Sequence, residues 1–160
     1  MVLDANLFSQ LPRFILLMGL VFVLAAGLQD LFTRRIANVL CAGMALLGLS
    51  YTILTDAGTL LQHFGSAILV FLPSLLLYRR AFFGGGDVKM ITALALWLMP
   101  GQLALFVIWT LMCGGVAGLL VLGYTMVRRM LDSSRHMVSG VPYGVGIAGG
   151  FLVAVGQVVR

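Results

Sequence analysis

Carboxylate side chains are the first candidates for chemistry in this sequence, because they can act as acids, bases or metal ligands. The chain has five aspartates and no glutamate. Three of the aspartates lie in a polar tail or in short polar connections and are not candidates: Asp4, Asp56 and Asp132. Asp30 and Asp87 each border a long apolar run, where an ionisable group is costly and marks a functional candidate. We therefore treat Asp30 and Asp87 as the candidate pair.

Two carboxylates held close together can hydrolyse a peptide bond with water alone. Each charge raises the proton affinity of the other, so the pair shares one proton. The ionised partner takes a proton from the attacking water, while the protonated partner stabilises the oxyanion that develops on the carbonyl. No metal and no cofactor is expected. The alternative is structural: Asp30 pairs with Arg34 one helical turn later, and Asp87 caps the helix that follows it.

A run of glycines comes directly before Asp87: Gly84, Gly85 and Gly86. The run is not a phosphate-binding P-loop, because Lys89 has neither the required glycine spacing before it nor a Ser or Thr after it. Glycine has no side chain, so backbone or a substrate strand can approach the carboxylate closely. On a helix Lys89 points away from Asp87, and we interpret it as an interface anchor or a substrate contact.

The elements that carry these residues are predicted to be membrane helices. Of the 160 residues, 61% are hydrophobic and only 9% are charged, whereas soluble chains carry about 25% charged residues. Six apolar runs could cross a hydrocarbon core of about 30 Å: 14–29, 37–55, 60–78, 88–99, 103–125 and 141–158. The first run also resembles a signal-peptide core, and we expect an uncleaved anchor. The sequence predicts an all-α polytopic membrane protein with about six transmembrane helices in one integral-membrane domain, residues 1–160.

The positions of the basic residues predict the orientation of these helices. Eight of the ten Lys and Arg residues lie in or beside the first, third and fifth connections: Arg34, Arg35, Arg79, Arg80, Lys89, Arg128, Arg129 and Arg135. The second and fourth connections contain none. The positive-inside rule places the basic connections in the cytoplasm and both termini in the periplasm. Topology therefore explains the net charge of +5 without nucleic acid, and membrane lipid is the expected partner of these cations.

Small residues and cysteines add two further expectations. The pairs Gly114–Gly118 and Gly146–Gly150 have the four-residue spacing that lets helices approach closely in lipid. Cys41 and Cys113 lie far apart in apolar runs, with no C-x-x-C pair. Neither a zinc site nor a disulfide framework is therefore predicted.

Three segments, taken together and in this order, resemble the aspartic prepilin leader peptidases, specifically the short form associated with Flp (tight-adherence) pili. Residues 30–38, D-L-F-T-R-R-I-A-N, are similar to the first motif of that family, an Asp followed by Ile-Pro-Asn. Residues 84–89, G-G-G-D-V-K, resemble its G-x-G-D motif, and residues 141–144, V-P-Y-G, resemble its closing Pro-aromatic-Gly signature. The resemblance covers essentially the whole chain and implies a G-x-G-D aspartic protease fold.

The resemblance also implies roles for individual residues and a substrate. Asp30 and Asp87 would be the catalytic pair, with the three glycines and five further residues as active-site support: Asn38, Lys89, Pro142, Tyr143 and Gly144. The substrate would be a prepilin in the bacterial inner membrane, whose short basic leader is removed at the cytoplasmic face after a glycine that precedes the hydrophobic pilin helix.

Two departures from the family pattern modify these expectations. Ala37 stands where the family usually has proline, which predicts a looser turn after the first run. Larger members carry a cytosolic insertion with paired cysteines and also methylate the new N-terminus. No such insertion fits here, so we expect peptidase activity without N-methyltransferase activity.

Other functions remain as alternatives. Presenilin-type proteases also use a G-x-G-D acid, but their first acid follows a tyrosine, whereas Gln29 precedes Asp30. A proton-coupled transporter could use the same two acids as a relay, although the sequence shows no internal repeat of the kind that many transporters have. A pilus-assembly scaffold with a decayed site is the third alternative, and the intact acids and glycines argue against it.

Overall fold

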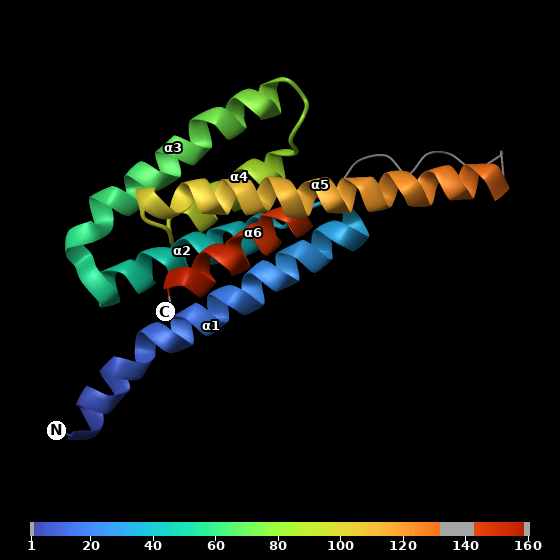
Figure 1. The fold of residues 1–160 in the computed structure, drawn as a ribbon. Coiled ribbons are helices and arrows are strands. Elements are labelled where there is room, and N and C mark those ends of the chain that lie inside the picture. Colours follow the sequence, from blue (N-terminus) through green and yellow to red (C-terminus); the bar gives the residue numbers. More distant parts are fainter. Residues whose placement is uncertain (1, 132–142, 159–160) are drawn as a thin grey trace.

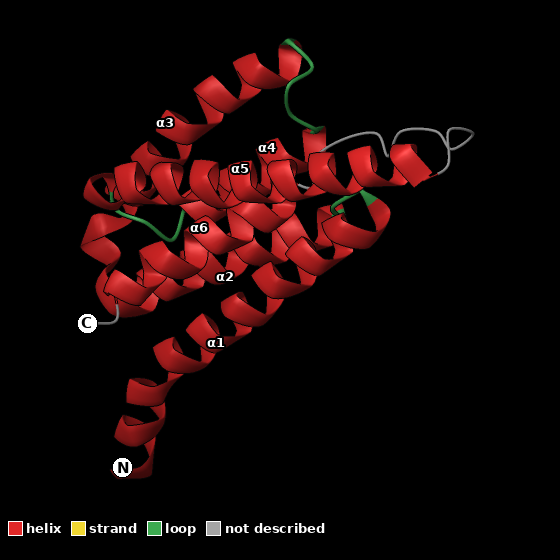
Figure 2. Ribbon diagram, turned by 45° about the vertical axis from the view of Figure 1, so that its right-hand side comes forward, coloured by secondary structure: helices red, strands yellow, loops and turns green. Residues whose placement is uncertain are grey.

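The computed structural model describes residues 2–131 and 143–158, and this part of the chain forms helices and no strand (Figures 1 and 2). The all-α prediction is therefore confirmed over the described residues. The elements are α1 Val2–Thr33, α2 Asn38–Asp56, the short 3-10 helix η1 Ala57–Thr59, α3 Leu60–Arg79, α4 Gly85–Ala95, α5 Pro100–Leu131 and α6 Tyr143–Val158.

Three stretches are long and apolar enough to cross a membrane: Gln10–Thr33, Asn38–Arg79 and Pro100–Arg128. The second stretch contains both α2 and α3, which are joined by η1, and Tyr143–Gly156 is a shorter apolar helix. Large apolar side chains on the outer faces of α1 and α5 are exposed to the surroundings; Val21, for example, is 63% exposed and Leu119 is 70% exposed. Such surfaces are compatible with lipid and not with water. The chain is a multi-pass membrane protein.

Helix α4 is shorter than a membrane-spanning helix, as the short apolar run 88–99 indicates. It has 11 residues and spans about 16 Å at 1.5 Å per residue, which is too short to cross about 30 Å of hydrocarbon alone. The chain leaves the helix after Ala95 and turns through Leu96–Met99. Most of α4 is buried against α2, α3 and α6. Its residues are apolar because they face protein.

Trp97 anchors the turn that follows α4. Its side chain is 2% exposed, and its indole N–H donates a hydrogen bond of 2.9 Å to the Met44 carbonyl of α2. The ring stacks on Tyr51 at a centroid distance of 5.5 Å and meets the edge of Phe151 at 5.8 Å. Aromatic contacts and a satisfied indole N–H together stabilise one well-defined packing arrangement. Trp97 thereby ties α2 and α6 to the end of α4.

Glycines allow α5 and α6 to pack at very short range, as their spacing predicts. A Cβ atom added to Gly146 would lie 2.5 Å from the Gly114 Cα atom. One added to Gly150 would lie 2.6 Å from the Thr110 backbone nitrogen. Neither position has room for a side chain, so the expected close approach at Gly114 and Gly146 is confirmed. In a membrane such backbone proximity gives the dispersion contacts that hold helices together.

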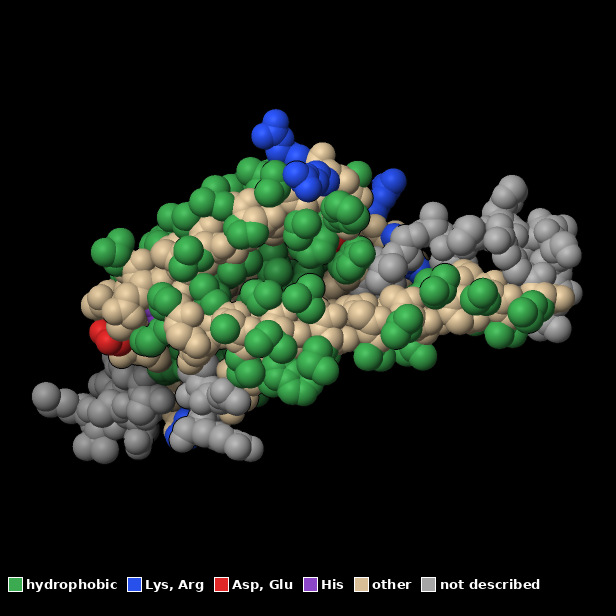
Figure 3. Space-filling view, turned by 45° about the horizontal axis from the view of Figure 1, so that its top comes forward, with side chains coloured by type: hydrophobic (Ala, Val, Ile, Leu, Met, Phe, Trp, Pro, Cys, Tyr) green, Lys and Arg blue, Asp and Glu red, His purple; other side chains and the backbone are tan. Residues whose placement is uncertain are grey.

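The two ends of the bundle differ in charge. The α1–α2 connection carries Arg34 and Arg35, and the α3–α4 connection begins beside Arg79 and Arg80. The two connections are neighbours, because a Cβ atom on Gly86 would lie 3.2 Å from the Ile36 Cβ atom. Figure 1 shows that α1 begins and α6 ends at the opposite end of the bundle. In Figure 3, hydrophobic side chains cover the middle of the visible face and most visible Lys and Arg side chains gather toward one end.

The helices that carry the two candidate acids are held mainly through other helices. Helix α1 packs on α2 and α6, and α4 packs on α2, α3 and α6. The backbones of α1 and α4 do not pack closely against each other. Helices α2 and α6 therefore position the first acid-bearing helix relative to the second.

Candidate active site

Asp30 lies in the last turns of α1 and faces the beginning of α6. Its side chain is only 6% exposed, and its Oδ2 atom accepts a hydrogen bond of 2.8 Å from the Gly144 backbone N–H. Gly144 is in the first turn of α6, where backbone N–H groups have no partner within the helix and favour a negative charge. The start of α6 therefore fixes one oxygen of the Asp30 carboxyl group.

Asp87 is the third residue of α4 and closes the N-terminal turn of that helix. Its Oδ2 atom accepts a hydrogen bond of 3.0 Å from the Gly84 backbone N–H, which forms the side-chain half of a capping box. The structural alternative for Asp87, a helix cap, is therefore correct as far as one oxygen is concerned. Within the described residues, the other oxygen, Oδ1, has no hydrogen-bond partner. Capping leaves that oxygen available for chemistry.

The two carboxyl groups line the same cavity. This cavity has a volume of about 290 Å³ and is bounded by the end of α1, the α1–α2 connection and the start of α4. The lining residues are Asp30, Arg34, Arg35, Ile36, Gly84, Gly85, Gly86 and Asp87. The structure thus brings together both candidate acids and all three glycines, and we refer to this space as the aspartate cavity.

Two glycines beside the aspartate cavity are close to neighbouring atoms: Gly144 has no room for a side chain, and Gly86 has little. A Cβ atom on Gly144 would lie 2.7 Å from the Asp30 Cβ atom and 2.9 Å from its Oδ2 atom. A Cβ atom on Gly86 would lie 3.2 Å from the Ile36 Cβ atom and 3.4 Å from the Ile36 backbone nitrogen. Gly85 is different, because its nearest neighbour would be the Tyr78 ring at 3.6 Å, an ordinary contact. Gly144 and Gly86 therefore set how closely the surrounding helices approach the acids.

The connection after α1 is held by a side chain that the sequence analysis did not identify. Arg34 ends the helix with a φ of 54°, in the left-handed region that non-glycine residues rarely adopt. Three residues later the Ala37 N–H donates a hydrogen bond of 3.0 Å to the Gln29 Oε1 atom. Proline, the usual family residue, has no N–H and could not make this bond. Ala37 is therefore tied to the last turns of α1 by Gln29, and a looser turn than proline would give stays a prediction.

Asn38 and Lys89 form a second link, between α2 and α4. The Lys89 ammonium group donates a hydrogen bond of 2.9 Å to the Asn38 Oδ1 atom. Within the described part of the chain, Lys89 forms no ion pair with a carboxylate. Lys89 therefore points toward α2 and is not the charge partner of Asp87, as its position on the helix predicts.

The third predicted segment is described only in part. Pro142 lies outside the described residues, whereas Tyr143 and Gly144 open α6. The Tyr143 ring packs on Phe83, the residue before the glycine run, with a centroid distance of 5.3 Å. Among the described residues, no group of three or more His, Cys, Asp or Glu side chains is arranged to hold a metal ion. The chemistry of this site is that of two carboxyl groups, backbone N–H groups and the cations at its rim.

The sequence of the chain is similar to that of a known protein family. Residues 17–119, well over half of the chain, match the type IV leader peptidase family. The chain belongs to this family. This type IV leader peptidase is accordingly a prepilin peptidase, an aspartic endopeptidase of the membrane. The matched region contains both candidate acids, the glycine run and the Asn38–Lys89 pair, and it ends before α6. Neither the curated proteins nor the solved structures gave a match to this leader peptidase.

Proposed function

We propose that this leader peptidase removes the short basic leader of a Flp-type prepilin at the cytoplasmic face of the bacterial inner membrane. Asp30 and Asp87 share one proton and activate a water molecule for attack on the scissile carbonyl. The observation that carries the proposal is that both carboxyl groups line one cavity of about 290 Å³. Neither a metal ion nor a covalent intermediate is needed for this chemistry.

The hydrogen bonds of the two acids support this mechanism. The Oδ2 atom of each carboxyl group is held by a backbone N–H, from Gly144 for Asp30 and from Gly84 for Asp87. The remaining oxygens are then oriented by bonds that do not change during the reaction, a form of preorganisation. One remaining oxygen takes the proton from water, and the other donates a hydrogen bond to the carbonyl oxygen. The two acids titrate as a unit, so the proposal assigns the proton to the pair.

The glycine run suits the shape of the substrate at the scissile bond. A peptide bond inside a helix is shielded, and its carbonyl is already hydrogen bonded, so the prepilin must unwind at the leader junction. An extended strand can lie close to the backbone at Gly84, Gly85 and Gly86 because these residues have no side chains. Arg34 and Arg35 line the same cavity, so positive charge surrounds the carboxyl groups.

The proposed topology has six spans, with the aspartate cavity on the cytoplasmic side and both termini in the periplasm. The apolar stretches and the separate helices α2 and α3 support this arrangement. So does the placement of Arg34, Arg35, Arg79 and Arg80 beside the cavity end of the bundle. In this topology α4 and the turn after it together form the fourth crossing, and residues 1–160 form one domain.

Cleavage of a Flp-type prepilin by the purified protein in liposomes tests the proposal. We expect mass spectrometry to show a product shortened by the leader, with no added methyl group when S-adenosylmethionine is present. Asp30→Asn and Asp87→Asn should each abolish cleavage, because the pair then loses its ionisable partner. The control variant Asp56→Asn, which changes the exposed aspartate at the end of α2, should cleave normally. Product that persists in either active-site variant would refute the two-carboxylate mechanism. If the wild-type protein gives no product, a pilus-assembly scaffold is favoured. If it gives no product but carries a proton flux across the liposome membrane, a transporter is favoured.

A further inference from the structure

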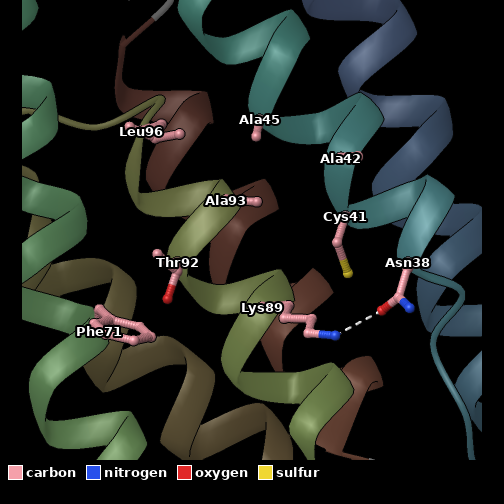
Figure 4. Close-up of a pocket in the computed structure, with 9 residues that line it drawn as sticks. All are labelled: Asn38, Cys41, Ala42, Ala45, Phe71, Lys89, Thr92, Ala93 and Leu96. Atoms are coloured by element: carbon pink, nitrogen blue, oxygen red, sulfur yellow. Dashed lines mark hydrogen bonds between the residues drawn. The ribbon is translucent and has the colours of Figure 1, made fainter.

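A second cavity lies next to the aspartate cavity, on the outside of α4. It has a volume of about 370 Å³ and is bounded by α2 on one side, α3 on the other and α4 at its base (Figure 4). Helices α2 and α3 are joined at η1 and share few contacts beyond it, so the cavity is a groove between them. We call it the α2–α4 groove, and its lining residues are Asn38, Cys41, Ala42, Ala45, Phe71, Lys89, Thr92, Ala93 and Leu96.

Two matching helix faces form most of the groove. From α2 come positions 38, 41, 42 and 45; from α4 come positions 89, 92 and 93, and position 96 follows directly after its last residue. Both sets have the i, i+3, i+4, i+7 spacing of one helix face. Alanine, cysteine and threonine predominate, and small side chains let another helix approach closely within a membrane. The shape and composition of the groove therefore fit an apolar helix better than a polar ligand.

The groove lies beside the aspartate cavity. The Cys41 Sγ atom in the groove is 4.0 Å from the Gly86 carbonyl oxygen, which belongs to a residue lining the aspartate cavity. Lys89 follows Asp87 by two residues, and Asn38 follows Ile36 by two residues. The two cavities therefore lie side by side along the start of α4, and a chain whose scissile bond sits between the acids lies next to the groove.

The end of the groove nearest the acids carries a positive charge. As Figure 4 shows, the Lys89 side chain crosses from α4 toward α2, and its ammonium group donates to the Asn38 Oδ1 atom at 2.9 Å. Asn38 is neutral, and among the described residues no carboxylate pairs with this ammonium group. An ammonium group at the edge of an apolar groove favours an occupant that brings a carboxylate.

We propose that the α2–α4 groove binds the apolar helix of the prepilin that follows the scissile bond, with Lys89 pairing with an acidic side chain near the start of that helix. This inference rests on the proposed function. The aspartate cavity holds the junction, and the groove holds what remains attached to the membrane after cleavage. The groove therefore discriminates between substrates by their helix, separately from the chemistry at the acids.

Filling the groove tests the inference without changing either acid. Ala42 lines the groove and is exposed, and Ala104 is an exposed alanine on α5 outside it. We compare Ala42→Phe with Ala104→Phe on two probes: a full-length Flp-type prepilin in liposomes and a short soluble peptide that spans only the leader junction. Ala42→Phe should raise KM for the prepilin by about tenfold, which is about 1.4 kcal/mol, and leave kcat and peptide cleavage unchanged. Ala104→Phe should match the wild type on both probes.

Charge reversal tests the role of Lys89. Lys89→Glu should raise KM for a prepilin that carries Glu near the start of its helix, and replacing that Glu with Lys in the substrate should restore cleavage. A loss of packing alone would not be rescued by a change in the substrate. Equal loss of cleavage on both probes in Ala42→Phe would assign the groove to a structural lipid or to folding and would overturn the inference. Failure of the wild-type protein to cleave either probe would instead count against the proposed function.

Discussion

The contact between Gly144 and Asp30 predicts that a single methyl group on α6 will impair catalysis. In Gly144→Ala the new Cβ atom would lie 2.7 Å from the Asp30 Cβ atom, whereas carbon atoms pack at about 3.5–4.0 Å. Because the position of a Cβ atom is fixed by its backbone, α1 and α6 must therefore move apart by about 1 Å at this point. Because a misplacement of about 1 Å in a catalytic constellation costs about 100-fold in rate, we expect kcat to fall by about that factor. The corresponding increase in activation free energy is about 2.7 kcal/mol.

The assay is prepilin cleavage in liposomes under single-turnover conditions, with thermal unfolding in detergent as the measure of folding. Gly149→Ala is the matched control on the same helix. Its Cβ atom would meet the Cys113 Sγ atom at 3.0 Å, so it strains the α5–α6 contact and leaves Asp30 untouched. We expect Gly149→Ala to lose stability with little change in kcat. If a folded Gly144→Ala protein cleaves prepilin at nearly the wild-type rate, α6 does not position Asp30 and the reasoning is wrong.

Three further predictions follow from the same structure. Ala37→Pro removes the hydrogen bond to Gln29, which is worth about 0.5–1.5 kcal/mol, but it rigidifies a residue whose φ is already −66°, which is worth about 0.4–1 kcal/mol. The free energy of unfolding, measured by denaturation in detergent, should therefore change by less than about 1 kcal/mol. A much larger loss would show that the turn depends on Gln29. Trp97→Ala should lower the free energy of unfolding by about 3–5 kcal/mol because it leaves a large cavity; an unchanged unfolding midpoint would contradict the central packing role of Trp97. The dependence of kcat on pH should be bell-shaped, because the pair of acids is active with one proton and inactive with none or two; a rate that rises steadily to alkaline pH would exclude the shared proton.

The sequence predicted the helical class because apolar runs of membrane length leave few other folds, but hydropathy alone could not distinguish lipid from protein as the environment of α4. Residues 88–99 are apolar in either case, and the structure places most of α4 against α2, α3 and α6. The cap at Asp87 was one of the two interpretations that the sequence left open, because an acid in the first turn of a helix can accept from free backbone N–H groups.

The partners of Asp30 and Ala37 were harder to predict. The Gly144 N–H lies 114 positions from Asp30 in the sequence, and only the packing of α1 on α6 brings the two together. One feature of the sequence does point to an acceptor such as Gln29. Ala37, in place of proline, has a backbone N–H just after a helix, and such a group needs a hydrogen-bond acceptor. The identity of that acceptor depends on the left-handed turn at Arg34, which no local pattern specifies.

Because α1 and α4 do not pack closely against each other, this enzyme can be inhibited away from its acids. The distance between its two acids depends on α2 and α6, which pack on both acid-bearing helices. A compound or a substitution that wedges α2 or α6 outward would silence hydrolysis from a distance, without approaching either carboxyl group.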